Sequence, residues 1–488
     1  MKKVFHDSEL EFFEQVSFDC NPLHRDDAYA RKTQFGQKVV FGMYAVLFGL
    51  GEWLKGRNVR LSTIKGEFKK PLFVDIPYDL EFVERDTRTD ITFSSNGSIF
   101  LKLRIGQVDF QDVLFSWPTS PPFVPRHQAA DGLQYDESGI LEIPASRYCC
   151  GWNEGMPPPE HLRLRRKQLP FEQMTVLLWS SYFAGMEVPG KQALYSSFEF
   201  RFETGGSATA NDFQISPLRV EMDRRFNRLT ILGSATGTPS IVISSFERPV
   251  SIQTPVELIQ QSVSRTSSMA GKKVLITGAS RGFGAVLAIV FALQGAQVIL
   301  NFFKSRRDAE DLADRIASCA PRPVLLPGNA GSENDWKAMK GQIDSIDILV
   351  NNASPVIPAM TFKEQTSEDF ISFVNRSLEL FLVPCKQLIP GMSTGGIVVQ
   401  ISSVFVAQPE PGFSHYIAAK SAAEGIMHSL ALEHEHLRFL VFRAPRMLTD
   451  QTNTVVPIPN IESPVEVAKT LLDCFDKFAS GENFQLFP

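Results

Sequence analysis

The sequence has few cysteines, no long apolar run and no strong charge of either sign, and each absence excludes a class of protein. Six cysteines in 488 residues, without the spacing of metal ligands, argue against a disulfide-rich secreted domain and a metal site. No apolar run reaches the roughly twenty residues of a membrane span, and the Met-Lys-Lys start lacks a signal peptide's apolar segment. A net charge of −5 with dispersed Lys and Arg disfavours nucleic-acid binding. We therefore expect a cytoplasmic protein with no metal, nucleic-acid or membrane partner.

In the second half of the chain, a glycine-rich turn separates an apolar strand from an apolar helix. Residues 277–284 read Thr-Gly-Ala-Ser-Arg-Gly-Phe-Gly and follow the apolar segment 274–276. A strand that turns through glycines into a helix points free backbone N–H groups at an anion, and the helix dipole adds positive potential there. Gly278 permits the tight turn, while Gly282 and Gly284 permit close approach of a phosphate and of helix to strand. The turn therefore predicts a pyrophosphate site.

Downstream residues have the chemistry of carbonyl reduction. Tyr416 and Lys420 lie one helical turn apart, Ser403 lies thirteen residues before Tyr416, and Asn375 lies twenty-eight before Ser403. A nearby ammonium favours the phenolate, so we expect Lys420 to lower the pKa of Tyr416, which can then protonate a carbonyl oxygen as hydride reaches the carbon. Ser403 would hold that oxygen by a hydrogen bond.

In this order and at these spacings, the elements resemble the short-chain dehydrogenase/reductase family over residues 271–488. The resemblance implies an α/β Rossmann fold with a doubly wound parallel sheet, and a water held by Asn375 that relays protons to Lys420. The residues that it implies for binding the nicotinamide cofactor are Gly278, Ser280, Arg281, Gly282, Phe283, Gly284, Asn301, Lys304, Asn329, Ala330, Asn352, Ala353, Tyr416, Lys420 and Pro445.

The choice of nicotinamide cofactor depends on the end of the second expected strand. An NAD site usually has a carboxylate there for the ribose 2′-hydroxyl, but this strand ends in Asn301 and no carboxylate follows until Asp308. Lys304 and Arg281 instead offer cations for a 2′-phosphate, which favours NADPH. The alternative is that Lys304, Arg306 and Arg307 form only a solvated helix start, so Arg281 is the stronger candidate.

The segment before the last expected helix departs from the family pattern. Pro445 precedes Arg446 where the family usually has Pro-Gly, and little chain separates Thr454 from the helix that begins near Pro464. The helical lid that closes over a small substrate is thus expected to be missing. A short lid suits a long or tethered substrate, or a domain that has lost its activity.

A second signature lies near the start of the chain. Residues 19–24 read Asp-Cys-Asn-Pro-Leu-His, and Phe41-Gly42 begins an apolar helix. The motif resembles that of MaoC-like hydratases, which have the hot-dog fold. Asp19 and His24 are a suitable pair for adding or removing water across a carbon–carbon double bond, and the Gly42 N–H would hold a thioester oxygen. The family usually has His where this chain has Phe41.

Residues 165–250 are expected to form a second hot-dog repeat, with an apolar helix over 171–186 and four alternating strands, but without the Asp/His motif. The expected fold is an α+β double hot-dog region followed by the α/β Rossmann domain. The expected divisions are 1–120 for the first repeat, 121–164 for a connecting segment with a Pro-rich bridge at 117–125, 165–250 for the second repeat, 251–270 for a linker and 271–488 for the reductase.

Together the resemblances imply a bifunctional NADPH-dependent 3-oxoacyl-thioester reductase and 3-hydroxyacyl-thioester dehydratase. Its substrates would be carried on acyl carrier protein or coenzyme A in fatty-acyl or polyketide-type synthesis, by a homodimer or tetramer. Three alternatives stay open: a non-catalytic hot-dog module that binds acyl chains or mediates dimerisation, a reductase domain reduced to a scaffold, and flux in the degradative direction.

Overall fold

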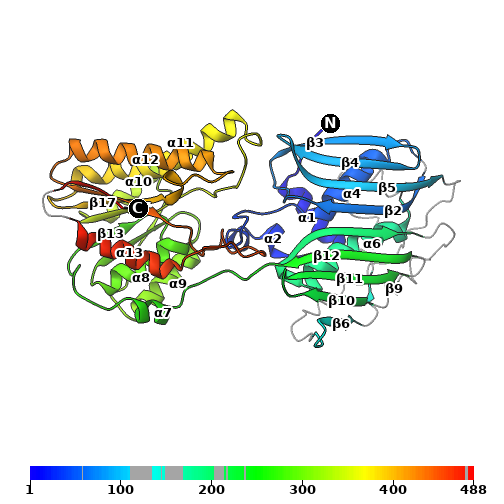
Figure 1. Ribbon diagram of the computed structural model, residues 1–488, viewed down its shortest axis with the longest axis horizontal. Helices are drawn as coiled ribbons and strands as arrows, with labels where there is room; N and C mark the ends of the chain where they lie inside the picture. The colour runs from blue at the N-terminus through cyan, green and yellow to red at the C-terminus, as the bar shows by residue number, and fades with distance from the viewer. Residues whose placement is uncertain are drawn as a thin grey trace. The chain divides into compact units, whose positions relative to one another are not determined.

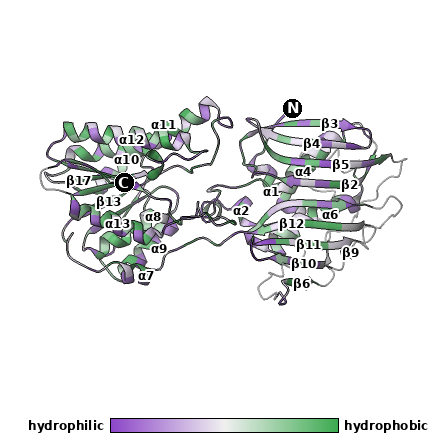
Figure 2. Ribbon diagram, viewed as in Figure 1, coloured by the Kyte–Doolittle hydropathy of each residue, from purple (hydrophilic) through white to green (hydrophobic). Residues whose placement is uncertain are grey.

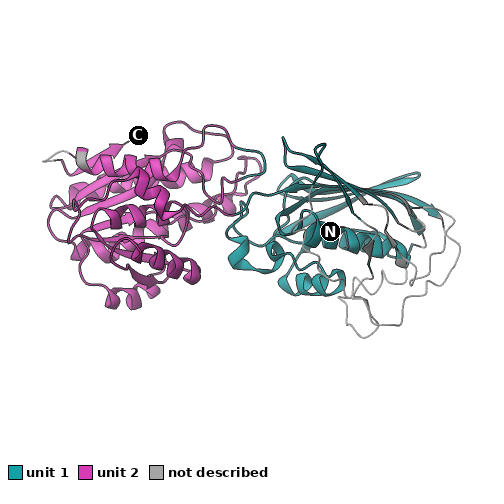
Figure 3. Ribbon diagram, turned by 90° about the horizontal axis from the view of Figure 1, so that it is seen from below, with its two compact units in different colours: residues 1–250, 454–457 teal, residues 251–453, 458–488 magenta. Residues whose placement is uncertain are grey.

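Two β-sheets organise the chain in the computed structural model, one antiparallel and one parallel (Figure 1). The structure describes residues 1–57, 59–109, 135–143, 146–148, 169–202, 214–215, 218–235, 238–478 and 482–487. Unit 1 comprises Met1–Val250 with Thr454–Pro457, and unit 2 comprises Ser251–Asn453 with Ile458–Pro488 (Figure 3). In the described residues, no helix is both long enough and apolar enough to cross a bilayer.

One continuous antiparallel sheet forms unit 1, in the order β1-β3-β4-β5-β2-β8-β12-β11-β10-β6, with β9 and β7 attached beside β11. Its strands are β1 (Lys2–Val4), β2 (Val59–Phe68), β3 (Pro77–Arg85), β4 (Arg88–Ser95), β5 (Ser98–Asp109), β6 (Ile140–Ile143), β7 (Ser146–Arg147), β8 (Ala193–Arg201), β9 (Gln214–Ile215), β10 (Leu218–Asp223), β11 (Arg228–Ala235) and β12 (Thr238–Glu247). Hydrophilic and hydrophobic residues follow one another along these strands (Figure 2). This alternation leaves one face of the sheet apolar.

Two apolar helices, α4 (Gly42–Trp53) and α6 (Phe171–Tyr182), lie beside each other against that face. Gly49 allows α4 to approach the sheet, because a Cβ there would lie 3.0 Å from the Phe93 ring. The helical segments around them are α1 (Asp7–Ser17), α2 (Pro22–Arg25), α3 (Asp27–Ala30), the π-helix η1 (Phe183–Glu187) and η2 (Gly190–Gln192).

Strands β2 and β8 join the first half of unit 1 to the second. They pair antiparallel, with Ile64 opposite Phe200 and Gly66 opposite Phe198. A Cβ on Gly66 would lie 2.2 Å from the Phe198 ring, so the glycine is required where this ring crosses the junction. Each half thereby contributes one helix and one run of strands to a shared core.

The elements expected for residues 165–250 are present, with one difference in the helix. α6 ends at Tyr182 and continues as the π-helix η1, whereas we expected one apolar helix over 171–186. The four expected strands correspond to β8, β10, β11 and β12. β6, which falls in the expected connecting segment, is paired with β10 in the sheet. The Pro-rich bridge at 117–125 lies outside the described residues.

Unit 2 has a seven-stranded parallel sheet in the order β15-β14-β13-β16-β17-β18-β19. Helices cover both faces, with α7, α8, α9 and α13 on one and α10, α11 and α12 on the other (Figure 1). The strands are β13 (Lys273–Ile276), β14 (Gln297–Phe302), β15 (Val324–Pro327), β16 (Ile348–Asn351), β17 (Ile397–Ser403), β18 (Arg438–Ala444) and β19 (Phe484–Phe487). The helices are α7 (Val256–Ser262), α8 (Gly282–Leu293), α9 (Arg306–Ala317), α10 (Glu333–Met339), α11 (Ser367–Leu388), α12 (Ser414–Glu433) and α13 (Pro464–Lys477), with the 3₁₀ turns η3 (Lys340–Gln342), η4 (Ile389–Gly391) and η5 (Val404–Val406).

The central strands are buried on both faces, as a parallel sheet between two helical layers requires. Val274 and Ile276 of β13 pack in the core with α8, while Leu275 between them packs in the core with α11 and α12. The segment 251–270, expected as a linker, contains α7, and Val256 and Ile259 are buried in the α8 core. The whole segment is therefore part of unit 2.

Candidate functional site

The glycine-rich turn between β13 and α8 is shaped by close contacts. Gly278 has φ +64° and Gly282 has φ +56°, in the left-handed region that favours glycine. A Cβ on Gly284 would lie 2.4 Å from the Gly278 carbonyl oxygen. The first N–H groups of α8 have no partner within the helix, as at any helix start, so its N-terminus can bind an anion.

Residues that follow β16 hold this turn in place. Thr277 Oγ1 accepts hydrogen bonds from the backbone N–H groups of Asn352 (3.0 Å) and Ala353 (3.1 Å). The Asn352 side-chain Nδ2 donates to the carbonyl oxygens of Thr277 (3.1 Å) and Gly278 (3.2 Å). Asn352, expected to contact the cofactor, thus braces the turn, and Ala353 lies 3.0 Å from the Cβ position of Gly278.

At the end of β14, the Asn301 side chain is directed to the neighbouring strand. It is buried, and its Nδ2 donates to the carbonyl oxygens of Leu326 (3.2 Å) and Gly328 (3.0 Å). Lys304 is exposed, with its Nζ 5.3 Å from the centroid of the Phe303 ring. Asn301 therefore braces β14 against β15, and Lys304 provides a cation at this strand end.

The other cofactor residues expected from the sequence lie near the same strand ends. Arg281 is partly exposed and its Nη1 lies 3.7 Å from an Asp450 carboxylate oxygen. The Asn329 side chain accepts a hydrogen bond from the Gly331 N–H, and Ala330 is buried. The remaining three positions are Ser280, which is partly exposed in the glycine-rich turn, Phe283, which is buried, and Pro445, which follows β18.

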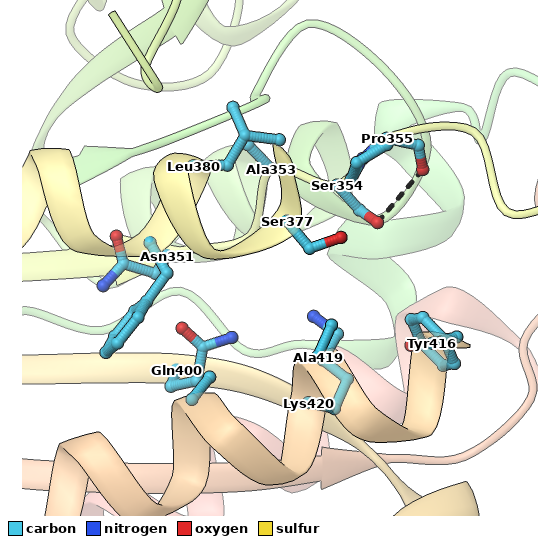
Figure 4. A pocket seen from close by; sticks show the side chains of 12 residues that line it. Asn351, Ala353, Ser354, Pro355, Ser377, Leu380, Gln400, Tyr416, Ala419 and Lys420 are labelled. Carbon is cyan, nitrogen blue, oxygen red and sulfur yellow. Dashed lines mark hydrogen bonds between the residues drawn. The ribbon is translucent and has the colours of Figure 1, made fainter. Parts of the chain in front are cut away.

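Tyr416 and Lys420 project from α12 into a pocket between α11 and α12 (Figure 4). Ser403, at the end of β17, lies near enough to Tyr416 for its hydroxyl to favour the phenolate and so oppose a rise in the Tyr416 pKa. Lys420 Nζ donates to the Ile401 carbonyl oxygen at 2.7 Å and lies 5.6 Å from the centroid of the Tyr416 ring. Hydroxyl, phenol and ammonium thus meet at the carboxyl end of β17, where ligands of doubly wound sheets bind.

Burial determines the direction in which the pKa values of Lys420 and Tyr416 are shifted. It lowers the pKa of Lys420 to about 8, and the Glu424 carboxylate opposes that shift. It also raises the pKa of Tyr416, against the hydrogen bond from Ser403. We expected Lys420 to lower the Tyr416 pKa. In the protein without cofactor the Tyr416 pKa is raised instead, because the cost of burying a phenolate is the largest effect on it.

Asn375 is not among the residues that line this pocket, and its expected role stays a prediction. It is exposed on α11 and borders a separate surface hollow with Ile371 and Arg376. Ser377 lines the Tyr416 pocket instead (Figure 4). Helix positions two residues apart point about 200° apart, so Asn375 and Ser377 lie on different sides of α11. Ser377 lies midway between the buried Phe373 and Phe381.

Two further residues of the pocket were not predicted from the sequence. The side-chain oxygens of Asn351 and Gln400 are buried without a hydrogen-bond partner in the described residues, and both residues line the pocket. Their amide nitrogens are bonded, to Cys385 Sγ and to the Ile401 carbonyl oxygen respectively. These oxygens give the pocket two buried acceptors.

In unit 1, Asp19 lies between the start of α2 and the C-terminal end of α6. It is 2% exposed, and its Oδ2 accepts a hydrogen bond from Ser181 Oγ at 2.7 Å. Its Oδ1 accepts from the Asn21 N–H at 3.1 Å, and a Cβ on Gly185 would lie 2.4 Å from that oxygen. Burial raises the pKa of Asp19 to about 7, although the hydrogen bond from Ser181 opposes this.

His24 stands at the end of the same motif, on α2. Its Nδ1 bonds to the Val39 carbonyl oxygen at 2.7 Å, so Nδ1 carries the proton and Nε2 holds the lone pair. The ring stacks on Phe41, with centroids 4.0 Å apart. Burial lowers the pKa of His24 to about 4, so the imidazole is neutral at neutral pH.

The thioester-oxygen donor expected at Gly42 lies at the N-terminus of α4. Phe41 caps this helix, and its carbonyl oxygen accepts from the N–H groups of Tyr44 and Ala45. Gly42 lies against Phe68, and a Cβ there would be 2.7 Å from that ring. The glycine is therefore needed for packing, and the N–H groups that precede Tyr44 have no partner within the helix.

Comparison with known proteins assigns both halves. The profile of the short chain dehydrogenase family matches residues 272–458, and that of the MaoC like domain matches residues 3–93. A 3-oxoacyl-[acyl-carrier-protein] reductase FabG of Staphylococcus aureus is 31% identical over 170 residues, which are 33% of this chain and 68% of the relative. A glucose 1-dehydrogenase of Gluconobacter oxydans is 34% identical over 176 residues, 34% of this chain and 64% of the relative.

Among solved structures, a short chain dehydrogenase from Burkholderia cenocepacia in complex with NADP is similar, with 24% identity and a TM-score of 0.40 over 45% of this chain and 96% of that one. The angucycline C-6 ketoreductase LanV with bound NADP has 19% identity and a TM-score of 0.41, over 46% of this chain and 96% of that one. On the family profiles and the FabG relative, the chain belongs to the short-chain dehydrogenase family in its second half and carries a MaoC-like domain in its first.

Proposed function

We propose that unit 2 reduces a 3-oxoacyl thioester with NADPH and that unit 1 removes water from the 3-hydroxyacyl product to give a 2-enoyl thioester. The observation that carries the proposal is the meeting of Tyr416, Lys420 and Ser403 at one strand end, on a chain that also holds Asp19 beside Ser181 and a neutral His24. The FabG relative is named for the first of these reactions.

The glycine-rich turn fits a dinucleotide. Gly278 and Gly284 leave no space for side chains, so the backbone can approach a pyrophosphate closely. Arg281 and Lys304 are the cations nearest in sequence to the turn and to the end of β14, while Asn301 offers no carboxylate for a ribose 2′-hydroxyl. These features support NADPH rather than NADH. When bound, NADPH supplies the hydride.

In the reduction, Tyr416 gives its phenolic proton to the carbonyl oxygen that gains negative charge. Ser403 hydrogen-bonds the same oxygen and so stabilises it in the transition state. The Lys420 ammonium stabilises the phenolate that Tyr416 becomes, and Ser377 with the oxygens of Asn351 and Gln400 can hold a water through which the proton is replaced. The expected role of Asn375 thus passes to Ser377 in this proposal.

In the dehydration, His24 and Asp19 divide the two proton transfers. His24 Nε2 has the free lone pair and removes the α-proton of the 3-hydroxyacyl thioester. Asp19 has a pKa near 7, so its protonated form can give its proton to the departing hydroxyl, which leaves as water. The N–H at Gly42 would hold the thioester oxygen while it has enolate character.

The second half of unit 1 encloses the substrate region in this proposal. We take α4 and α6 on the joined sheet as a double hot-dog, in which only the first repeat carries the Asp/His motif. Trp179 and Phe183 are fully buried and stack on each other, so they are core residues. Fusing both activities on one chain raises the effective concentration of the hydroxyacyl intermediate at the second site.

The proposal is tested by mixing purified protein with NADPH and a short 3-oxoacyl thioester, and following nicotinamide absorbance and product mass together. Loss of NADPH with a product lighter by one water supports both activities. Loss of NADPH with a hydroxyacyl product alone supports the second candidate, in which unit 1 only binds acyl chains; Phe41 stacked on His24 favours that candidate. No reaction with either coenzyme A or carrier-protein thioesters would contradict the proposal.

A further inference from the structure

A buried carboxylate that the reaction does not use lies one helical turn beyond Lys420. Glu424 is 9% exposed, on the face of α12 that covers the sheet. A buried carboxylate needs hydrogen bonds and an opposite charge to remain ionised. It has both, and they come from two neighbouring strands of the sheet.

The hydrogen bond comes from β17 and the charge from β18. Ser402 Oγ donates to Glu424 Oε1 at 2.5 Å. The Arg443 guanidinium donates to both carboxylate oxygens, through Nε at 3.0 Å and Nη2 at 2.7 Å. Such a two-point ion pair fixes both distance and orientation, so Glu424 ties α12 to two neighbouring strands.

Glu424 is the third residue on this face of α12 that meets the end of β17. Ser403 acts on Tyr416, the Ile401 carbonyl accepts a hydrogen bond from Lys420, and Ser402 donates one to Glu424. Because residues i, i+4 and i+8 of a helix lie on one face, a displacement at Glu424 shifts Lys420 and Tyr416 relative to Ser403.

Glu424 is also the anion that acts on Lys420. Its charge opposes the effect of burial on the Lys420 pKa. Of the residues lining the pocket, only Tyr416 and Lys420 titrate, and α11 contributes Ser377, Leu380 and Phe381, which carry no charge. β18 contributes Arg443, which lies against Glu424 and partly cancels its field at Lys420. Glu424 and Arg443 therefore act on Lys420 with opposite signs.

We propose that Glu424 is a positioning residue of the reductase site, which holds α12 in register with β17 and keeps Lys420 charged while Tyr416 donates its proton. This inference rests on the proposed reductase function for its consequence, but the effect on Lys420 belongs to the protein without cofactor or substrate.

The test measures the pKa of Lys420 directly, by competitive labelling with acetic anhydride across a pH series and peptide mass spectrometry. Glu424→Gln keeps the side-chain size and removes the charge, so the Lys420 pKa should fall by about half a unit to one unit. Arg443→Met removes the cation and should raise the Lys420 pKa. Glu433→Gln, at an exposed position of the same helix, is the matched control and should change nothing.

Shifts of opposite sign in the two variants support the inference, because loss of packing alone would move both in one direction. Unchanged Lys420 labelling in folded Glu424→Gln would overturn it. If Glu424→Gln does not fold, the double variant Glu424→Gln with Arg443→Met removes both partners and so avoids a lone buried charge. The Lys420 pKa of the double variant must then lie below that of Arg443→Met and above the value predicted for Glu424→Gln. Because labelling needs no substrate, shifted pKa values in a protein without reductase activity would reject only the proposed function.

Discussion

The two candidate catalytic pairs differ in what holds them together. Tyr416 and Lys420 lie four residues apart on one helix, so the helix itself sets their separation. Asp19 is held by Ser181 and Gly185, more than 160 residues along the chain, and His24 by the Val39 carbonyl. A pair on one element depends on local structure, whereas a pair on a loop depends on the fold of the whole unit. The predictions below test this difference.

The largest effect is expected for Tyr416→Phe. The variant lacks the proton that the carbonyl oxygen receives, so reduction of a 3-oxoacyl thioester should fall by about 10³-fold. Dehydration of supplied 3-hydroxyacyl thioester should be unchanged, because that reaction uses unit 1. Both rates are measured on the same preparation. Equal loss of the two activities in a folded protein would contradict separate sites.

Asp19→Asn should produce the opposite pattern. An amide cannot give a proton to the departing hydroxyl, so dehydration should fall by about 10²- to 10³-fold while NADPH oxidation persists. Ser181→Ala is the related variant that leaves the carboxylate in place. Without the hydroxyl the pKa of Asp19 should rise further, so the pH profile of dehydration should shift to higher pH.

The stability of unit 1 should respond to pH in opposite ways in two variants. The pKa of Asp19 is raised from 3.8 to about 7, so stability from this group is present below pH 4 and is lost as pH rises through 7. The pKa of His24 is lowered from 6.5 to about 4, so stability from that group is present above pH 6.5 and is lost as pH falls through 4. Between pH 4 and 7 the stability from Asp19 falls while that from His24 rises, so the two pH dependences nearly cancel in the native protein.

Asp19→Asn leaves only the His24 contribution, and the free energy of unfolding should rise by about 2–3 kcal/mol between pH 4 and 7. His24→Gln leaves only the Asp19 contribution, and it should fall by a similar amount. The free energy of unfolding of unit 1 is measured at pH 4 and 7 from the hydrogen exchange of α4 peptides in a series of urea concentrations. Parallel pH dependence in the two variants would show that neither group is held as described.

A smaller effect distinguishes the two faces of α11. Ser377→Ala should slow reduction by about tenfold, because the pocket loses a polar group beside Lys420. Asn375→Ala should leave the rate within about a factor of two, since that side chain is exposed outside the pocket. Rates at saturating NADPH provide the comparison. A reversed order of the two effects would restore the role first expected for Asn375.

The smallest effect concerns the choice of cofactor. Arg281→Leu should weaken NADPH binding by about five- to tenfold and leave NADH binding nearly unchanged, because the lost charge would meet only a 2′-phosphate. Nicotinamide fluorescence titration measures both affinities. Lys304→Leu, at an exposed position, should have a smaller effect. Equal weakening of both cofactors by Arg281→Leu would argue against 2′-phosphate recognition.

The sequence predicted most where chemistry and local geometry coincide. The turn at Gly278, the separation of Tyr416 and Lys420 and the start of the last helix near Pro464 followed from glycine positions and local spacing. Spacing along the chain did not show that Asn375 would be exposed and Ser377 would line the pocket, because spacing to a distant residue does not fix the side of a helix that a residue occupies. Glu424 and Arg443 were missed because their pairing joins a helix to a strand and leaves no local pattern. The contact of Ser181 with Asp19 likewise depends on tertiary packing.

Because β2 pairs with β8 within one chain, the joined core of unit 1 should not depend on protein concentration. An interface between separate chains weakens as concentration falls, because association competes with translational freedom. Here the two halves of unit 1 meet through strands of one polypeptide, and α6 brings Ser181 to Asp19 within that same chain. The surroundings of Asp19 should therefore be identical at nanomolar and millimolar protein, and its half-titration point should be independent of concentration.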